Sequence, residues 1–188
     1  MSGMEGTAKE RILECARKLF SEYTFSQVSM KDIAKSAGVS VALVVKHFGS
    51  KGQLFAATID FTDSRKALFG GPFERIGYAA VEETLTAPYN APYSMARTIS
   101  IAAGDSESLE DIGKRIKADL ALVLQDRIQR EAPEANPSPR LRAQAALSLL
   151  MGLSFMRRFG DTDFEKYDRD ELIADYAPRL QAIIDGDS

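Results

Sequence analysis

Residues 29–54 read SMKDIAKSAGVSVALVVKHFGSKGQL, and this stretch decides the fold of the N-terminal part of the chain. Its centre, IAKSAGVS over residues 33–40, places an isoleucine and two alanines on one side of a short helix, where a second helix can cross closely. Gly38 supplies the permissive backbone that a tight turn between crossed helices needs. Ser40 can then cap the next helix. The stretch therefore predicts a helix-turn-helix.

The rest of the chain also reads as helical, because apolar residues recur with spacings of three and four and no stretch alternates with a period of two. Capping boxes are predicted at Thr7 with Glu10 and at Ser50 with Gln53, and Pro178 should kink or interrupt the last helix. We expect an all-α fold of about nine helices, with a helix-turn-helix domain over residues 1–55 and a helical ligand-binding and dimerisation domain over residues 56–188. The expected helices cover about 8–23, 30–37, 41–48, 51–69, 72–85, 92–103, 109–130, 139 onward and 168 onward.

Composition narrows the class of protein. The chain has 188 residues, of which 45% are hydrophobic, so a packed core is expected. No apolar run reaches the ~18 residues of a membrane span, and the start lacks the pattern of a secretion signal. A single cysteine excludes an internal disulfide and a multi-cysteine metal site. These features favour a cytoplasmic protein. The net charge of −3 is unevenly distributed along the chain: the first 66 residues carry +3 and the remainder −6. This distribution is typical of a DNA-binding domain joined to an acidic C-terminal domain.

Residues 8–55 resemble the N-terminal domain of the TetR family of bacterial regulators. Two positions depart from the family pattern: Val45 stands where the family usually has tyrosine, and Gly52 where it usually has an acid. The resemblance implies a regulator that binds double-stranded operator DNA as a homodimer and responds to a small molecule. The matching positions are Ser29, Ile33, Ala34, Ala37, Gly38, Val39, Ser40, Ala42, His47, Phe48, Ser50 and Lys51.

A DNA-binding surface is predicted around the second helix of the motif. Lys51 is expected to meet a phosphate at a helix N-terminus, the alternative being an ordinary solvated lysine. Val41 and Ala42 can offer only apolar contact, for example with a thymine methyl group. No Arg, Asn or Gln occurs over residues 41–48, so specificity should rest on DNA shape, methyl contacts and dimer spacing. The candidate DNA-binding residues are Ser29, Lys31, Ser40, Val41, Ala42, Lys46, His47 and Lys51.

Two further surfaces are predicted in the C-terminal part. Residues 145–156 are apolar nearly all round, which favours a helix that packs against a second subunit as well as its own core. The candidate dimer residues are Leu149, Gly152, Leu153, Ile173, Tyr176, Leu180 and Ile183; packing within a monomer is the alternative. An apolar or amphipathic effector is expected among Tyr78, Tyr89, Tyr93, Met95, Phe155 and Met156, which could equally be core residues.

The function predicted from the sequence is a DNA-binding transcriptional regulator, expected to be a ligand-responsive repressor on an inverted-repeat operator. Activation rather than repression is left open. An enzyme is disfavoured, because one histidine, one cysteine and no phosphate-binding glycine loop leave no catalytic constellation; no cofactor and no metal are expected. A helical interaction module that keeps the fold without specific DNA binding is the other alternative, favoured by the few polar residues over 41–48.

Overall fold

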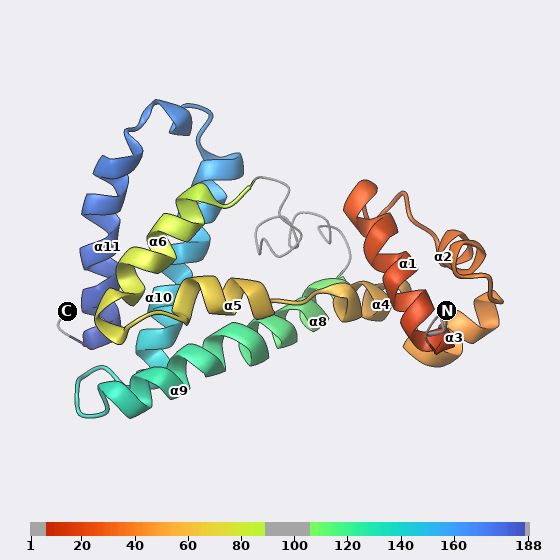
Figure 1. Cartoon of the computed structure of the whole chain (residues 1–188), viewed down its shortest axis with the longest axis horizontal. Helices are drawn as coiled ribbons and strands as arrows, with labels where there is room; N and C mark the ends of the chain where they lie inside the picture. The colour runs from red at the N-terminus through yellow and green to blue at the C-terminus, as the bar shows by residue number, and fades with distance from the viewer. Residues whose placement is uncertain (1–6, 89–105, 187–188) are drawn as a thin grey trace, which may run out of the picture. The chain divides into compact units, whose positions relative to one another are not determined.

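The computed structural model describes residues 7–88 and 106–186, which form helices and connecting turns with no strand (Figure 1). The predicted all-α fold is confirmed; the helix expected at 92–103 lies outside the described residues. By compactness the chain divides into two units, one of residues 1–60 with 98–115 and the other of residues 61–97 with 116–188. The domain boundary expected after residue 55 stays a prediction.

The helices of the first unit begin where local capping chemistry places them. The predicted capping boxes at Thr7 and Ser50 are both present, and Ser29 forms a third with Asp32. The hydrogen bonds that Asp32 accepts from Ser29 lower the pKa of its carboxyl group, so the group stays ionised at the positive end of its helix. The helices of this unit are α1 (Ala8–Glu22), α2 (Met30–Ala37), α3 (Val41–Phe48), α4 (Lys51–Thr58) and most of α8 (Ser106–Ile116).

An aromatic cluster joins α1, α4 and the loop before α2. The Phe55 ring packs edge-on against Phe20, with centroids 4.9 Å apart, and against Phe25 at 5.5 Å. Ile12 and Ala16 continue the buried face of α1. Edge-to-face aromatic pairs stabilise a core beyond the area that they bury, and they favour particular orientations of the rings. The cluster therefore fixes the loop between α1 and α2 relative to α4.

The expected helix over residues 51–69 is wrong, because the structure divides it into α4 and α5 (Thr62–Phe69). Ile59 ends α4 in an extended conformation, with φ −77° and ψ 128°. Ile59 and Phe61 are both buried, while Asp60 between them is exposed. Residues two apart point roughly 200° apart around an α-helix, so one continuous helix could not bury both on one side. The extended residue at the end of α4 allows Ile59 and Phe61 both to be buried.

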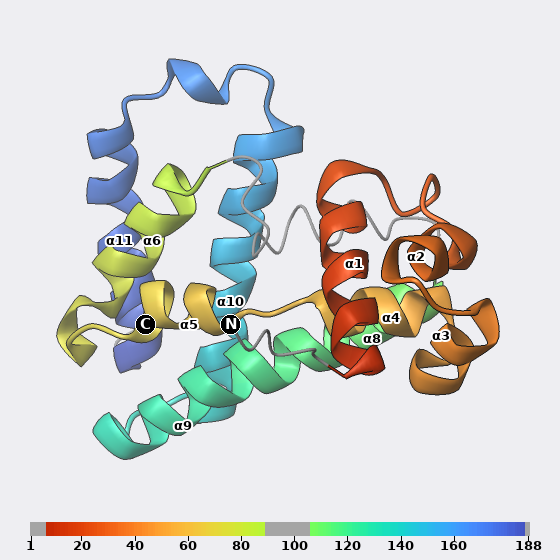
Figure 2. The ribbon, with the colours of Figure 1, turned by 45° about the vertical axis from the view of Figure 1, so that its right-hand side comes forward.

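The second unit packs α6 (Ile76–Thr86) against α10 (Pro139–Phe155) and α11 (Arg169–Asp185), as Figures 1 and 2 show. The helix expected over 109–130 contains a π-helical turn, Lys117–Ala121, between α8 and α9 (Leu122–Glu131). A second π turn, Met156–Gly160, extends α10. Helix α11 runs through Pro178 without interruption, so the break expected there is wrong, while the alternative of a kink stays a prediction.

Arginine side chains close several helix ends whose carbonyl groups would otherwise lack partners. Arg115 donates to the carbonyl of Ile59 at the end of α4, at 3.0 Å, and Arg127 donates to the carbonyl of Phe69 at the end of α5. Arg157 donates to Thr84 and Ala87 at the end of α6, both at 3.0 Å. The last carbonyls of a helix carry partial negative charge, which a guanidinium satisfies well. These long-range contacts fix where helices end within each unit.

Candidate nucleic-acid interface

The turn between α2 and α3 has the geometry that the sequence predicts. Gly38 adopts a left-handed conformation, with φ 65° and ψ 37°, which a residue with a Cβ atom rarely adopts. Val39 N–H donates to the carbonyl of Ala34 at 3.0 Å, closing the end of α2. Ser40 Oγ then accepts from Leu43 N–H at 3.2 Å and caps α3. The two short helices are therefore held in a defined crossing.

Helix α3 buries one side and exposes another. Val44 is fully buried in the unit, whereas Val41, Ala42, Val45 and Lys46 are exposed. The exposed fractions of Val41 and Val45 are 41% and 47%. A recognition helix of this motif meets the major groove with such a face. We name these four residues the α3 outer face.

Most of the predicted DNA-binding residues are exposed in the structure. Ser29 and Lys31 lie at the start of α2, and His47 lies at the end of α3 beside Phe48. Val45, which the sequence analysis names only as a departure from the family tyrosine, is exposed beside the candidate residues of α3. The spacing of four residues from Val41 was the signal that could have placed it on the same face. The predicted residues found exposed are Ser29, Lys31, Ser40, Val41, Ala42, Lys46 and His47.

Lys51 is half-buried and has partners within the chain. Its Nζ donates to the carbonyl oxygens of Phe25 at 2.9 Å and Val28 at 3.1 Å. The ammonium also lies 4.1 Å from the centroid of the Phe25 ring, where the π face attracts a cation. Lys51 therefore fastens the start of α4 to the loop that precedes α2. The phosphate contact predicted for Lys51 stays a prediction.

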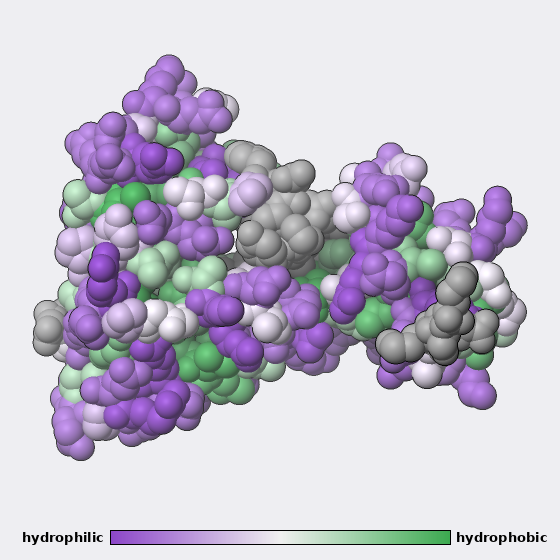
Figure 3. Space-filling view, in the orientation of Figure 1, coloured by the Kyte–Doolittle hydropathy of each residue, from purple (hydrophilic) through white to green (hydrophobic). Residues whose placement is uncertain are grey.

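In the second unit, α10 and its π turn present an exposed apolar face. Leu141, Phe155 and Phe159 are 54%, 55% and 51% exposed, and the Phe155 and Phe159 rings are 5.8 Å apart. Gly152 lies in the middle of this face, exposed, and a Cβ added there would meet nothing within 4 Å. On the side of the molecule seen in Figure 3, hydrophilic residues predominate, with smaller hydrophobic patches among them. We call this stripe the α10 outer face: Leu141, Ala145, Ser148, Leu149, Gly152, Phe155, Met156 and Phe159.

Of the seven predicted dimer residues, four have side chains or backbone at the surface and three are buried in the core. Gly152 is exposed, and Leu149, Tyr176 and Ile183 are half-buried. The other three are buried within their own unit: Leu153, Ile173 and Leu180. Periodic apolar spacing indicates that a helix face is covered, but not whether the same chain or a second chain covers it. The predicted list therefore contains both surface residues and core residues.

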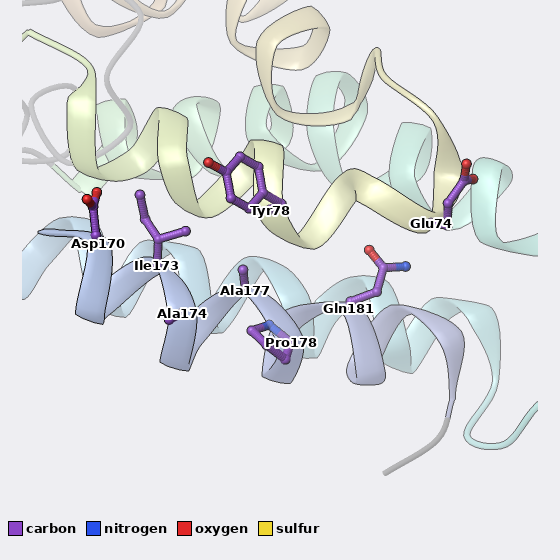
Figure 4. Close-up of a pocket in the computed structure, with 8 residues that line it drawn as sticks. All are labelled: Glu74, Tyr78, Asp170, Ile173, Ala174, Ala177, Pro178 and Gln181. Atoms are coloured by element: carbon purple, nitrogen blue, oxygen red, sulfur yellow. The ribbon is translucent and has the colours of Figure 1, made fainter.

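The predicted effector residues do not lie together at one site. Tyr78 lines a groove of about 560 Å³ between α6 and α11, with Glu74 at one end and Asp170 at the other (Figure 4). The rest of its lining comes from α11: Ile173, Ala174, Ala177, Pro178 and Gln181. Phe155 and Met156 do not line this groove and lie on the α10 outer face. Tyr89, Tyr93 and Met95 lie outside the described residues.

The part of the chain that the structure describes contains neither a candidate metal site nor a candidate membrane-spanning helix. Within residues 7–88 and 106–186, His, Cys, Asp and Glu nowhere gather in a group of three that could hold a metal ion. Among the same residues, no helix combines the length and apolar character that crossing a bilayer requires.

The crossed helices α2 and α3 with an exposed second helix, followed by a separate helical unit, define a helix-turn-helix transcriptional regulator. Two family models agree: "Bacterial regulatory proteins, tetR family" matches residues 12–58, and "Tetracyclin repressor-like, C-terminal domain" matches residues 74–184. The chain belongs to the TetR family of DNA-binding regulators, as its sequence predicts.

Known relatives match nearly the whole length of the chain. The HTH-type transcriptional regulator UidR of Escherichia coli K12 is 28% identical over 184 residues, covering 95% of this chain and 91% of the relative. A TetR transcriptional regulator from Rhodococcus sp. RHA1 shares the fold with a TM-score of 0.60 and 21% identity, over 97% of each chain. NalD, described as the secondary repressor of the MexAB-OprM multidrug efflux pump in Pseudomonas aeruginosa, has a TM-score of 0.57 and 22% identity, covering 92% of this chain and 96% of NalD.

Proposed function

We propose that this regulator represses transcription by binding, as a homodimer, to an inverted-repeat operator, and that a small molecule releases it. The observation that carries the proposal is the α3 outer face, displayed by a capped and glycine-terminated turn in a chain of this family. A two-fold dimer presents two such helices, so its half-sites should lie about one helical turn, ~34–36 Å, or a multiple of it, apart. Repression is supported by the likeness to NalD.

The experiment that tests DNA binding is selection of duplex DNA from a random pool, followed by affinity measurement against salt. An inverted repeat should be recovered, and its affinity should fall steeply as salt rises, because lysine contacts with phosphates release counterions. If no sequence is enriched over the pool, the helical interaction module becomes the better description.

Lys46 and Lys51 should respond differently to substitution. Lys46→Ala should weaken binding to all duplexes and lower the salt slope by about one, the effect of one lost phosphate contact, with thermal unfolding unchanged. Lys51→Met should lower the unfolding temperature as well as the affinity, because two hydrogen bonds and a cation–π contact are lost. Thermal unfolding and salt titration of both variants check this. An unchanged unfolding temperature in Lys51→Met would show that its internal contacts contribute nothing.

The effector is proposed to be apolar or amphipathic and to bind the C-terminal domain. It can release DNA only to the extent that it prefers the DNA-incompetent arrangement of the dimer, typically by about 1–3 kcal/mol. The match to the family's C-terminal domain supports this part of the proposal. A thermal-shift screen should find binders that also release the selected operator.

A further inference from the structure

The α3 outer face consists of three apolar side chains and one lysine. Val41 and Val45 are large apolar residues exposed by 41% and 47%, although the same helix already buries Val44 in the core. Their exposure is not required by packing within the unit. A water-facing pair of valines on the element that meets DNA therefore points to an apolar partner in the groove.

The chemistry of these residues limits what they can read. Valine and alanine have no side-chain hydrogen-bond donor or acceptor, so they cannot pair with the polar edges of bases. The apolar feature that a base pair presents in the major groove is the C5-methyl group of thymine. A cytosine carrying a methyl group at the same ring position offers the same chemistry. Both bases are 5-methylpyrimidines.

The spacing of the two valines fits neighbouring base pairs. Val41 and Val45 are four residues apart, which places them on one side of α3 and about 6 Å apart along its axis. Successive base pairs of B-DNA are about 3.4 Å apart. The two side chains thus span about two base-pair steps. Lys46, beside them on the α3 outer face, can supply a charge to a nearby phosphate without reading sequence.

We propose that Val41 and Val45 determine the specificity of this protein by contacting the C5-methyl groups of two pyrimidines in each half-site. The proposal rests on the DNA binding proposed above and names the chemical group that this surface recognises. Burial of one methyl group against a valine changes affinity by about threefold to tenfold. The two sensitive pyrimidines lie within about two to three base pairs of each other in each half-site, because the valines are one turn apart.

The test uses the full-length protein and the operator recovered by selection. Each thymine is replaced in turn by deoxyuridine, which removes only the methyl group, and in a second series each cytosine is replaced by 5-methylcytosine. We expect deoxyuridine to weaken binding about threefold to tenfold at two clustered positions of a half-site. A gain of similar size with 5-methylcytosine at such positions would identify cytosine as the natural carrier of the methyl group.

Matched variants assign the effect to the valines. Val41→Ala and Val45→Ala should each abolish the discrimination between thymine and uracil at one position, since both side chains are exposed and their truncation leaves the core intact. Lys46→Ala should weaken both operators alike and keep the discrimination. If the operator binds but neither base series changes affinity, or if the valine variants discriminate as well as the native protein, the methyl-reading proposal is wrong while the proposed function stands. If selection recovers no operator, the proposed function itself fails.

Discussion

A Gly152→Arg chain should be a monomer at micromolar concentration, and it should lose operator binding at the same time. Gly152 lies at the centre of the α10 outer face, where the chain itself leaves open space for a side chain. In the proposed dimer a second copy of α10 would cover this point, so an arginine would bury an unpaired charge there. Such a charge costs about 3 kcal/mol or more, equivalent to roughly a hundredfold in the dimerisation constant. Light scattering and a gel-shift assay with the selected operator measure the two effects.

The matched control is Gly113→Arg. Gly113 is also a helical glycine with nothing within 4 Å of an added Cβ atom, but it belongs to α8 in the first unit. This variant should remain dimeric. If Gly152→Arg also remains a dimer, the α10 outer face is not the interface. Phe155→Glu, which changes an exposed ring on the same face, provides a second variant with the same expected outcome.

Arg142→Ala should strongly destabilise the second unit. The Arg142 side chain is fully buried and donates to the carbonyl of Ile184 at 2.8 Å and to that of Ala132 at 2.5 Å, so it joins the ends of α11 and α9. Burial lowers the pKa of its guanidinium, and the nearby Asp185 carboxylate opposes this shift. Truncation leaves two helix-end carbonyls without their partner and opens a cavity.

We expect Arg142→Ala to lower the free energy of unfolding by about 3–5 kcal/mol, because two hydrogen bonds from a charged donor are lost, or to lower the unfolding temperature by roughly 6–20 °C at fixed protein concentration. Arg179→Ala is the control: Arg179 pairs with Asp175 one turn away on the exposed side of α11, and its loss should change stability by less than about 0.5 kcal/mol. Thermal and urea unfolding of both variants check the difference. Similar midpoints for Arg142→Ala and Arg179→Ala would contradict the assigned role of Arg142.

The sequence by itself determined the parts of this protein that depend on near neighbours. The capping boxes at Thr7 and Ser50 and the cap at Ser40 involve atoms only three residues apart, and the left-handed turn depends on Gly38 alone. Because these signals are local, the bounds of α1, α2 and α3 and the helix-turn-helix could be read directly. The motif also carried enough ordered positions to predict the family before the fold was known.

Only the tertiary structure decided what covers each apolar or charged group. Lys51 reads as a phosphate ligand in the sequence, yet its ammonium contacts carbonyls 23 and 26 residues away. Leu180 and Tyr176 share an apolar spacing, but Leu180 is fully buried in its own unit while Tyr176 is half-exposed. The break at Ile59 follows from burial that no local signal encodes. Apolar periodicity specifies that a surface must be covered, whereas the identity of the cover depends on how distant segments pack.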